Sequence, residues 1–265
     1  MIGAGEMHLQ NKSIVVTGGA SGIGAALCRE FASHSPRGIM VADIDEAGAQ
    51  SVADEIGGMA LVVDVADEAQ LQHLVRETTR HIGPVDLFCS NAGVGCQGGL
   101  DATNADWQRL WEINLMSHVY AARAVLPSML ERKQGYLLHT ASAAGLLTQL
   151  GSAPYAVTKH AAVAFAEWLS ITYWDSGIRV SCLCPQGVRT PLLDATPPGI
   201  NAMLMPTAIE PSEVARCTVA GIAEERFLIL PHAEVADFYR NRAGDNERWL
   251  RGMRRMQAKL FNPNQ

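Results

Sequence analysis

Short apolar segments alternate with helical segments along most of this chain, and no other feature restricts its fold as strongly. The expected helices include residues 47–56, 68–82, 106–132 and 155–175, and another begins near residue 210. Segments that are apolar throughout and separated by helices are typical of parallel sheets buried on both faces. We therefore expect a doubly wound α/β fold in which helices cover both faces of a seven-stranded parallel sheet. Its strands would be residues 13–17, 38–43, 59–63, 85–90, 136–140, 178–184 and 226–230.

Residues 1–265 are expected to form one domain, because neither a linker nor an internal repeat interrupts the pattern between residues 13 and 230. The core of this domain would span residues 11–230. Residues 188–209 contain four prolines and no regular period, and a loop of this length inside a compact domain is typical of a lid over a site. Residues 231–265 form a tail outside the alternation.

The tail differs in charge from the rest of the chain. It holds seven Lys and Arg against four Asp and Glu, whereas the whole chain has 21 against 27 and a formal net charge of -6. Trp249, Met253, Met256 and Leu260 recur at helical spacing, which predicts an amphipathic helix. We expect this helix to pack on its own subunit or on a neighbouring one, with a membrane-surface helix as the alternative.

Composition argues against several classes of protein. An acidic balance is unusual for a nucleic-acid-binding protein, which presents a basic face. No segment has the run of about 20 apolar residues that a membrane-spanning helix needs, and the first residues show no secretory signal. The six cysteines are dispersed without metal-ligand spacing, so we expect free thiols, no metal site and a reducing, cytoplasmic location.

A glycine-rich turn follows the first expected strand and leads into a helix. It reads Thr17-Gly-Gly-Ala-Ser-Gly-Ile-Gly24. Glycines allow a sharp turn and the close approach of a pyrophosphate, whose charge is stabilised by the helix N-terminus. We therefore expect a dinucleotide site of the Rossmann type. Its cofactor contacts here would be Gly18, Ser21, Gly22, Ile23 and Gly24.

Acidic residues at the ends of the next two strands indicate which dinucleotide binds. Asp43 ends the second strand, where a carboxylate can bind both ribose hydroxyls of NAD and repel the 2′-phosphate of NADP. Neither Ser21 nor Ile44 supplies a cation for that phosphate, so NAD is favoured over NADP. Asp64 and Val65 follow the third strand and are expected to reach the adenine, with a helix-capping role for Asp64 as the alternative.

Tyr155, Lys159 and Ser142 are the strongest candidates for catalysis. Tyr155 and Lys159 lie one turn apart on the same face of an expected helix. A neighbouring ammonium favours the phenolate of a tyrosine, which makes the phenol a usable acid or base near neutral pH. Ser142 follows the fifth strand, at the edge where open parallel sheets bind ligands, and could hold a substrate oxygen beside Tyr155.

With these motifs in this order, the chain resembles the short-chain dehydrogenase/reductase family over roughly residues 11–230. It matches TGxxxGIG at residues 17–24, NAG at residues 91–93 and the catalytic set Asn114, Ser142, Tyr155 and Lys159. The resemblance implies that Tyr155 is the general acid/base and that Ser142 orients the reacting oxygen. It also implies that Lys159 binds the nicotinamide ribose and lowers the pKa of the tyrosine, and that Asn114 holds a water in a proton relay. Further cofactor contacts are implied at Asn91, Ala92, Gly93, Tyr155, Lys159, Pro185, Gly187, Val188 and Thr190.

Three features depart from the pattern of the family. Ser90 stands where a second asparagine is common, Gln186 follows Pro185 where glycine is usual, and the tail extends beyond the last strand. Since the last strand helps to form the tetramer in many members, a homodimer and a homotetramer both stay open for this chain.

The expected reaction is hydride transfer between NAD(H) and a hydrophobic secondary alcohol or ketone. The expected substrate walls are largely apolar, and only Arg189 is an obvious anchor for a phosphate. The alternative enzyme is an NADPH-preferring ketone or 3-ketoacyl reductase, and the alternative outside enzymes is a non-catalytic nucleotide-binding regulator or scaffold. The expected substrate contacts are Val94, Ser142, Leu146, Gln149, Tyr155, Gln186, Leu193 and Met203.

Overall fold

A parallel sheet of seven strands forms the centre of the computed structural model, which describes residues 7–196 and 198–261. The strand order is β3-β2-β1-β4-β5-β6-β7, so the expected fold class is confirmed. Residues 1–6, 197 and 262–265, which belong to the expected domain, lie outside the described residues. The strands are β1 (Ser13–Thr17), β2 (Gly38–Asp43), β3 (Met59–Val62), β4 (Leu87–Ser90), β5 (Gly135–Thr140), β6 (Ile178–Leu183) and β7 (Leu228–Ile229).

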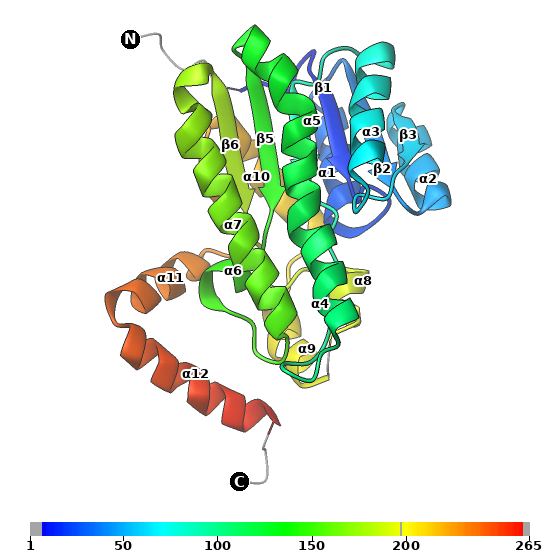
Figure 1. Cartoon of the computed structure of the whole chain (residues 1–265). Helices are drawn as coiled ribbons and strands as arrows, with labels where there is room; N and C mark the ends of the chain where they lie inside the picture. The colour runs from blue at the N-terminus through cyan, green and yellow to red at the C-terminus, as the bar shows by residue number, and fades with distance from the viewer. Residues whose placement is uncertain (1–6, 197, 262–265) are drawn as a thin grey trace.

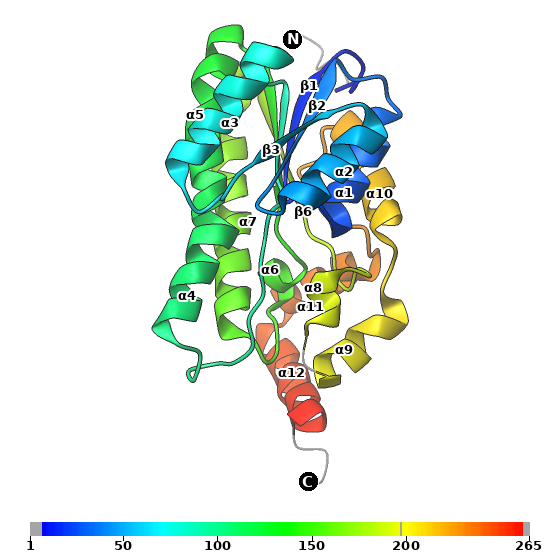
Figure 2. The same ribbon diagram turned by 90° about the vertical axis from the view of Figure 1, so that its right-hand side faces the viewer.

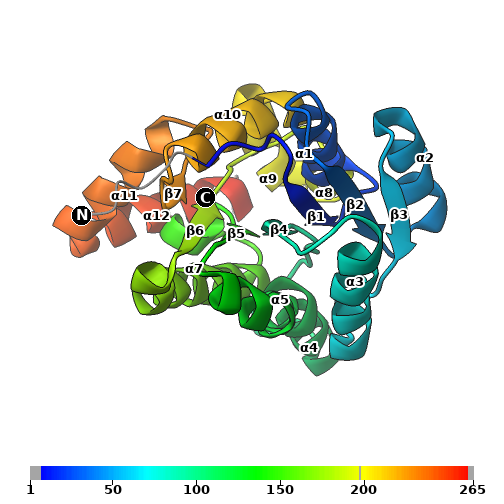
Figure 3. The same ribbon diagram turned by 90° about the horizontal axis from the view of Figure 1, so that it is seen from above.

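Helices cover both faces of this sheet (Figures 2 and 3). One face carries α1 (Gly22–Ala32), α2 (Glu46–Ile56) and α10 (Pro211–Ala223), and the other carries α3 (Glu68–His81), α5 (Ser117–Arg132) and α7 (Ala153–Tyr173). The alternating side chains of β1 serve both layers. Val15 packs in the apolar core beside α5, whereas Ile14 and Val16 pack in the core beside α1. Burial on both faces explains why the strands are apolar throughout.

The long helix expected at residues 106–132 contains an irregular turn. It comprises α4 (Asn104–Trp111), the π-helical turn η1 (Glu112–Met116) and α5. The helix begins two residues earlier than expected, because the Thr103 and Asp106 side chains form a capping box. The π-helical turn carries Asn114, and such turns occur frequently at functional sites.

The expected lid contains short helices rather than irregular chain. These are α8 (Pro191–Asp194), α9 (Pro198–Leu204) and the 3-10 turn η3 (Met205–Thr207). Prolines at the starts of α8 and η3 explain how short helices form without a long apolar period. A further 3-10 turn, η2 (Trp174–Ser176), follows α7.

The tail forms two helices rather than one, α11 (Glu234–Gly244) and α12 (Asn246–Phe261). Figure 1 shows them beyond the carboxyl ends of the strands, where α11 contacts α6 (Ala144–Leu147) and α12 contacts α9. Val235 is fully buried, and Trp249 packs against the core beside α5 and α7. The tail therefore packs on its own chain. Across the described residues, we find no helix with the length and apolar character needed to span a membrane.

Candidate active site

A cavity of about 1810 Å³ lies at the carboxyl ends of the strands, where open parallel sheets bind ligands. It begins at the glycine-rich turn after β1, passes the ends of β4 and β5, and reaches the lid and α12. Within the described residues, no group of His, Cys, Asp and Glu side chains is arranged to hold a metal ion.

The glycine-rich turn is shaped to receive a phosphate. Gly18 and Gly22 have φ angles of 64° and 53°, in the left-handed region that favours glycine. A Cβ at Gly24 would lie 1.9 Å from the carbonyl oxygen of Gly18, so the first turn of α1 packs on the loop with no room for a side chain. Gly18 and the whole segment 21–24 line the cavity at the N-terminus of α1. Close backbone approach and a helix N-terminus together fit a pyrophosphate.

Asp43 lies beside this turn at the end of β2. Its carboxylate accepts hydrogen bonds from the backbone N–H of Ala20, at 3.0 Å, and of Asp45, also at 3.0 Å. These bonds fix the carboxylate at the rim of the cavity. Asp64 and Val65 also line the cavity, and Asp67, not Asp64, caps the following helix α3. The capping alternative for Asp64 is therefore wrong.

Asn91 joins the glycine-rich turn to the centre of the sheet. Its Nδ2 donates to the carbonyl oxygens of Thr17 and Gly18, at 3.1 and 3.3 Å, while its Oδ1 accepts from the Thr140 hydroxyl at 3.1 Å. A second hydrogen bond joins the same two residues, because the Thr17 hydroxyl oxygen accepts from the backbone N–H of Asn91 at 3.0 Å. Asn91, Ala92 and Gly93 all line the cavity, so the segment both lines the cleft and holds the turn in place.

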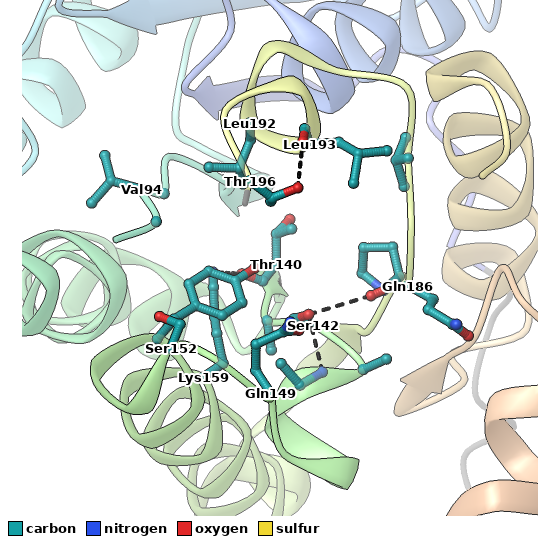
Figure 4. Close-up of a pocket in the computed structure, with 18 of the residues that line it drawn as sticks. Val94, Thr140, Ser142, Gln149, Ser152, Lys159, Gln186, Leu192, Leu193 and Thr196 are labelled. Carbon is teal, nitrogen blue, oxygen red and sulfur yellow. Dashed lines mark hydrogen bonds between the residues drawn. The ribbon is translucent and has the colours of Figure 1, made fainter. Parts of the chain in front are cut away.

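Tyr155, Lys159 and Ser142 come together on the other side of the cavity. The Lys159 ammonium donates to the carbonyl oxygen of Thr140 at 3.1 Å and lies 5.7 Å from the centroid of the Tyr155 ring. The Ser142 hydroxyl donates to the carbonyl oxygen of Pro185 at 3.4 Å (Figure 4). All three residues line the cavity, as the spacing of Tyr155 and Lys159 on α7 predicts.

Burial dominates the acid–base properties of this group. It raises the pKa of the Tyr155 phenol, while the hydrogen bond of Ser142 to the phenol acts in the opposite direction. It also lowers the pKa of Lys159 to about 8. The sequence predicts a lowered tyrosine pKa, whereas in the chain alone the pKa is raised. The reason is that desolvation penalises the phenolate, and the ammonium is directed at a backbone carbonyl.

Asn114 is completely buried and holds the loop after β4. Its Oδ1 accepts from the backbone N–H of Val94 at 2.9 Å, and its Nδ2 donates to the carbonyl oxygen of Val94 at 2.9 Å and to the Thr158 hydroxyl at 3.2 Å. Both hydrogens on Nδ2 are therefore used within the protein. The expected relay water at Asn114 stays a prediction.

The segment after β6 comes close to the glycine-rich turn and borders the cavity. Pro185, Gln186, Val188 and Thr190 line it, and the Thr190 methyl group lies 3.1 Å from where a Cβ on Gly22 would be. Gly187 does not line it, contrary to expectation. It turns toward the back of the lid, where its carbonyl oxygen accepts from His232 Nε2 at 3.0 Å.

The expected substrate contacts are mostly brought together. Val94, Gln149, Leu193 and Met203 line the cavity, and Figure 4 shows Leu192 and Leu193 across it from Ser142. Leu146 does not line it. Its side chain is buried in the core, and the next residue, Leu147, reaches the cavity instead. Gln186 lines the cavity, but its side chain points away from Ser142, and its buried Oε1 has no partner among the described residues.

Several lining residues are absent from the sequence-based expectation. Ser152 is one of them, whereas Cys96 and Thr148 lie within the expected wall segments 94–97 and 146–150. Thr148 has a φ of 82°, which is strained for a β-branched residue. The largest omission is the tail. Its amphipathic pattern predicts a helix with an apolar face but does not tell where that face packs. The tail residues that line the cavity are Phe238, Arg240, Asn241, Gly244, Asp245, Arg248, Trp249, Gly252, Met253, Arg255 and Met256.

Comparison with known proteins assigns this arrangement to a family. The family model of the short chain dehydrogenases matches residues 12–200. The chain belongs to the short-chain dehydrogenase/reductase family. It is an oxidoreductase of the kind that uses a nicotinamide cofactor, and the glycine-rich turn, Asp43 and the Asn91 segment fit such a group.

Three relatives illustrate the range of the family. A 1-deoxy-11-beta-hydroxypentalenate dehydrogenase from Streptomyces exfoliatus is 33% identical over 240 residues, which cover 86% of each chain. A meso-2,3-butanediol dehydrogenase from Serratia marcescens is 29% identical over 218 residues, which cover 79% of this chain and 86% of that protein. The crystal structure of a short-chain dehydrogenase/reductase from Burkholderia phymatum in complex with NAD has a TM-score of 0.82 at 30% identity, over 91% of this chain and 96% of that chain.

Proposed function

We propose that this chain is an NAD-dependent dehydrogenase that oxidises a hydrophobic secondary alcohol to a ketone, or catalyses the reverse reduction. One observation carries the proposal. Tyr155, Ser142, the glycine-rich turn and Asp43 line the same cavity, so an alcohol at the phenol can adjoin one end of a bound dinucleotide. Relatives named for hydroxypentalenate and butanediol support an alcohol as substrate.

The residues that would hold the cofactor follow the cavity in order. The segment 18–24 would bind the pyrophosphate, Asp43 the adenosine ribose, and Asp64 with Val65 the adenine. Asn91–Gly93, Lys159, Pro185, Val188 and Thr190 would surround the nicotinamide ribose and ring. NAD supplies the hydride acceptor when it is bound. Its preference over NADP is supported by the Asp43 carboxylate, by the uncharged Ile44 beside it and by the NAD bound in the Burkholderia relative.

The chain itself would supply the proton chemistry. Tyr155 would take the proton of the alcohol during oxidation and return it during reduction. Ser142 would hold the same oxygen, because its hydroxyl lies at the cavity wall and interacts with the phenol, where it opposes the larger effect of burial on the phenol pKa. Apolar side chains would exclude water from the body of the substrate, among them Leu147, Leu193 and Met203.

Tyr155→Phe tests the reaction. We expect its kcat for oxidation of a hydrophobic secondary alcohol to fall by roughly 10²–10⁴, the contribution of general acid–base catalysis. NAD binding, measured by calorimetry, should be retained. Tyr173→Phe, on the same helix but outside the cavity lining, serves as the control. Retained turnover in Tyr155→Phe would contradict the proposal and leave the scaffold alternative.

Initial rates with NAD and NADP test the cofactor. The wild type should prefer NAD, and the double variant Asp43→Ser with Ile44→Arg should shift that preference toward NADP, because a cation replaces the repelling carboxylate. Preference of the wild type for NADPH would instead support the ketone or 3-ketoacyl reductase.

A further inference from the structure

The face of α12 that meets the cavity is both apolar and cationic. Its lining residues follow one another at helical spacings, so they share one face. Arg251 and Arg254 belong to the same helix but do not line the cavity. Two of the four arginines of α12 therefore lie on the face that lines the cavity. Its lining residues are Arg248, Trp249, Gly252, Met253, Arg255 and Met256.

Arg248 and Arg255 are free to bind a ligand. Neither guanidinium has a hydrogen bond or ion pair to any residue within 7–196 and 198–261, and the bond from Arg248 to Asp245 uses the backbone N–H. Arg240, which also lines the cavity, differs because it pairs with Asp237 at 2.5 Å.

Arg189, the phosphate anchor expected from the sequence, is not part of this wall. It does not line the cavity and pairs with Glu210 at 3.2 Å. The segment after β6 therefore supplies no free cation to this wall, whereas the tail supplies Arg248 and Arg255; Arg109 on α4 also lines the cavity.

Gly252 leaves a hollow between the two arginines. A Cβ at this position would meet only the Arg255 guanidinium, at 4.0 Å. Trp249 and Met253 are half-buried beside it. This part of the wall has room for a ligand against apolar side chains, with a cation one turn away on each side.

Building on the proposed dehydrogenase, we propose that α12 is a substrate-recognition wall, and that Arg248 and Arg255 bind a carboxylate remote from the reacting hydroxyl. The planar fork of a guanidinium matches a carboxylate with two parallel hydrogen bonds. The apolar lining from Leu147, Leu193 and Met253 suits the body between the two polar ends. The substrate class is then a hydrophobic hydroxy acid rather than a neutral alcohol.

Matched acids and esters test this anchor. The substrates are medium-chain fatty acids with a secondary alcohol at the penultimate carbon, and their methyl esters. We expect kcat/KM with NAD to favour the acid by about tenfold in the wild type, as a charge-assisted hydrogen bond allows. The preference should disappear in the double variant Arg248→Gln with Arg255→Gln. The matched control, Arg251→Gln with Arg254→Gln, removes the same charge from the other side of α12 and should keep it.

Equal use of acid and ester by the wild type would overturn the anchor, as would an equal effect of the control variant. Binding of acid and ester to Tyr155→Phe in the presence of NAD, measured by calorimetry, reads the same preference without turnover. Turnover without a charge preference would leave the dehydrogenase standing and remove the anchor. A charge preference in binding without any turnover in the wild type would support the anchor and rule out the dehydrogenase.

Gly252→Leu tests the wall itself. Leucine is a better helix former than glycine, and its side chain would enter open space, so folding should be preserved. We expect about tenfold lower kcat/KM for the long hydroxy acids and no change for 2-butanol, which leaves the hollow empty. Unchanged rates for both substrates would show that α12 does not border the bound substrate.

Discussion

Lys159 combines deep burial with a charge that has no carboxylate partner among the described residues. It is 3% exposed, and its ammonium is bonded to the Thr140 carbonyl oxygen. Removal from water disfavours the charged form, and this lowers the pKa from 10.5 to about 8. The folded chain therefore holds the charged form of Lys159 at a cost in stability.

This cost predicts how stability changes with pH. Because the folded-state pKa lies below the unfolded one, the unfolded state binds more protons between pH 8 and 10.5. The free energy of unfolding of the wild type should therefore rise across this window relative to Lys159→Met, and the difference should be constant below it. Urea titrations of both proteins without cofactor provide the measurement. A difference that stays flat through the window would refute the lowered pKa.

The sequence predicts which residues form the site better than it predicts their pKa values or the direction in which their side chains point. The spacing of Tyr155 and Lys159 and the position of Ser142 after β5 place all three at one cavity. The direction of the tyrosine pKa was not predictable, because desolvation depends on how closely the neighbouring elements pack. Leu146 and Leu147 show the same limit, since one residue of rotation in α6 decides which of them reaches the cavity.

At the scale of elements, the turn η1 acts as a clamp between two parts of the site. Asn114, at its centre, is bonded to Val94 in the cavity loop and to Thr158 on α7. The π-helical turn thereby ties the loop after β4 to the helix that carries Tyr155 and Lys159.

Asn114→Ala should break this clamp. It leaves the N–H and carbonyl groups of Val94 without partners, and we expect a loss of about 2–4 kcal/mol in the free energy of unfolding. KM for the alcohol should rise because Val94 lines the cavity. Thr158→Val, which removes only one of the three bonds of Asn114, should cost about 1 kcal/mol. Equal stability of Asn114→Ala and the wild type in urea would contradict the clamp.

Elements with a strong local signal were predicted well, and elements set by packing were not. The alternation of apolar strands and helices predicts the seven-stranded parallel sheet, but not the order of its strands. The break between α11 and α12 had no clear signal, since no proline stands there and Gly244 alone does not specify a turn. The π-helical turn at Asn114 is likewise invisible in the helical periodicity of residues 104–132.

At the scale of the whole molecule, one exposed face is apolar enough to bind a second copy of the chain. Trp168 and Ile171 on α7 are 53% and 76% exposed, and Trp174 in η2 is exposed beside them. Large apolar side chains gathered on one helix face are typical of protein interfaces. We propose that this face forms a homodimer.

Ile171→Glu should weaken this dimer, because it places a charge in the apolar contact. We expect a monomer in sedimentation velocity at concentrations where the wild type is dimeric. Val62→Glu, an exposed position on the edge strand β3, is the control and should leave assembly unchanged. A monomeric wild type, or a dimer unaffected by Ile171→Glu, would rule out this interface.

The sequence positions of the cavity-lining residues bear on how the substrate specificity of such an enzyme can change during evolution. The glycine-rich turn, Asp43 and the Tyr155–Lys159 pair all precede residue 190, whereas the lid and tail walls come from residues 191–256. The family model ends at residue 200, within this second part. A graft of a foreign segment after β6 would replace the lid and tail walls and leave the glycines and the acid–base pair in place. In this modular arrangement, recombination near one crossover point can exchange specificity while inheriting the chemistry unchanged.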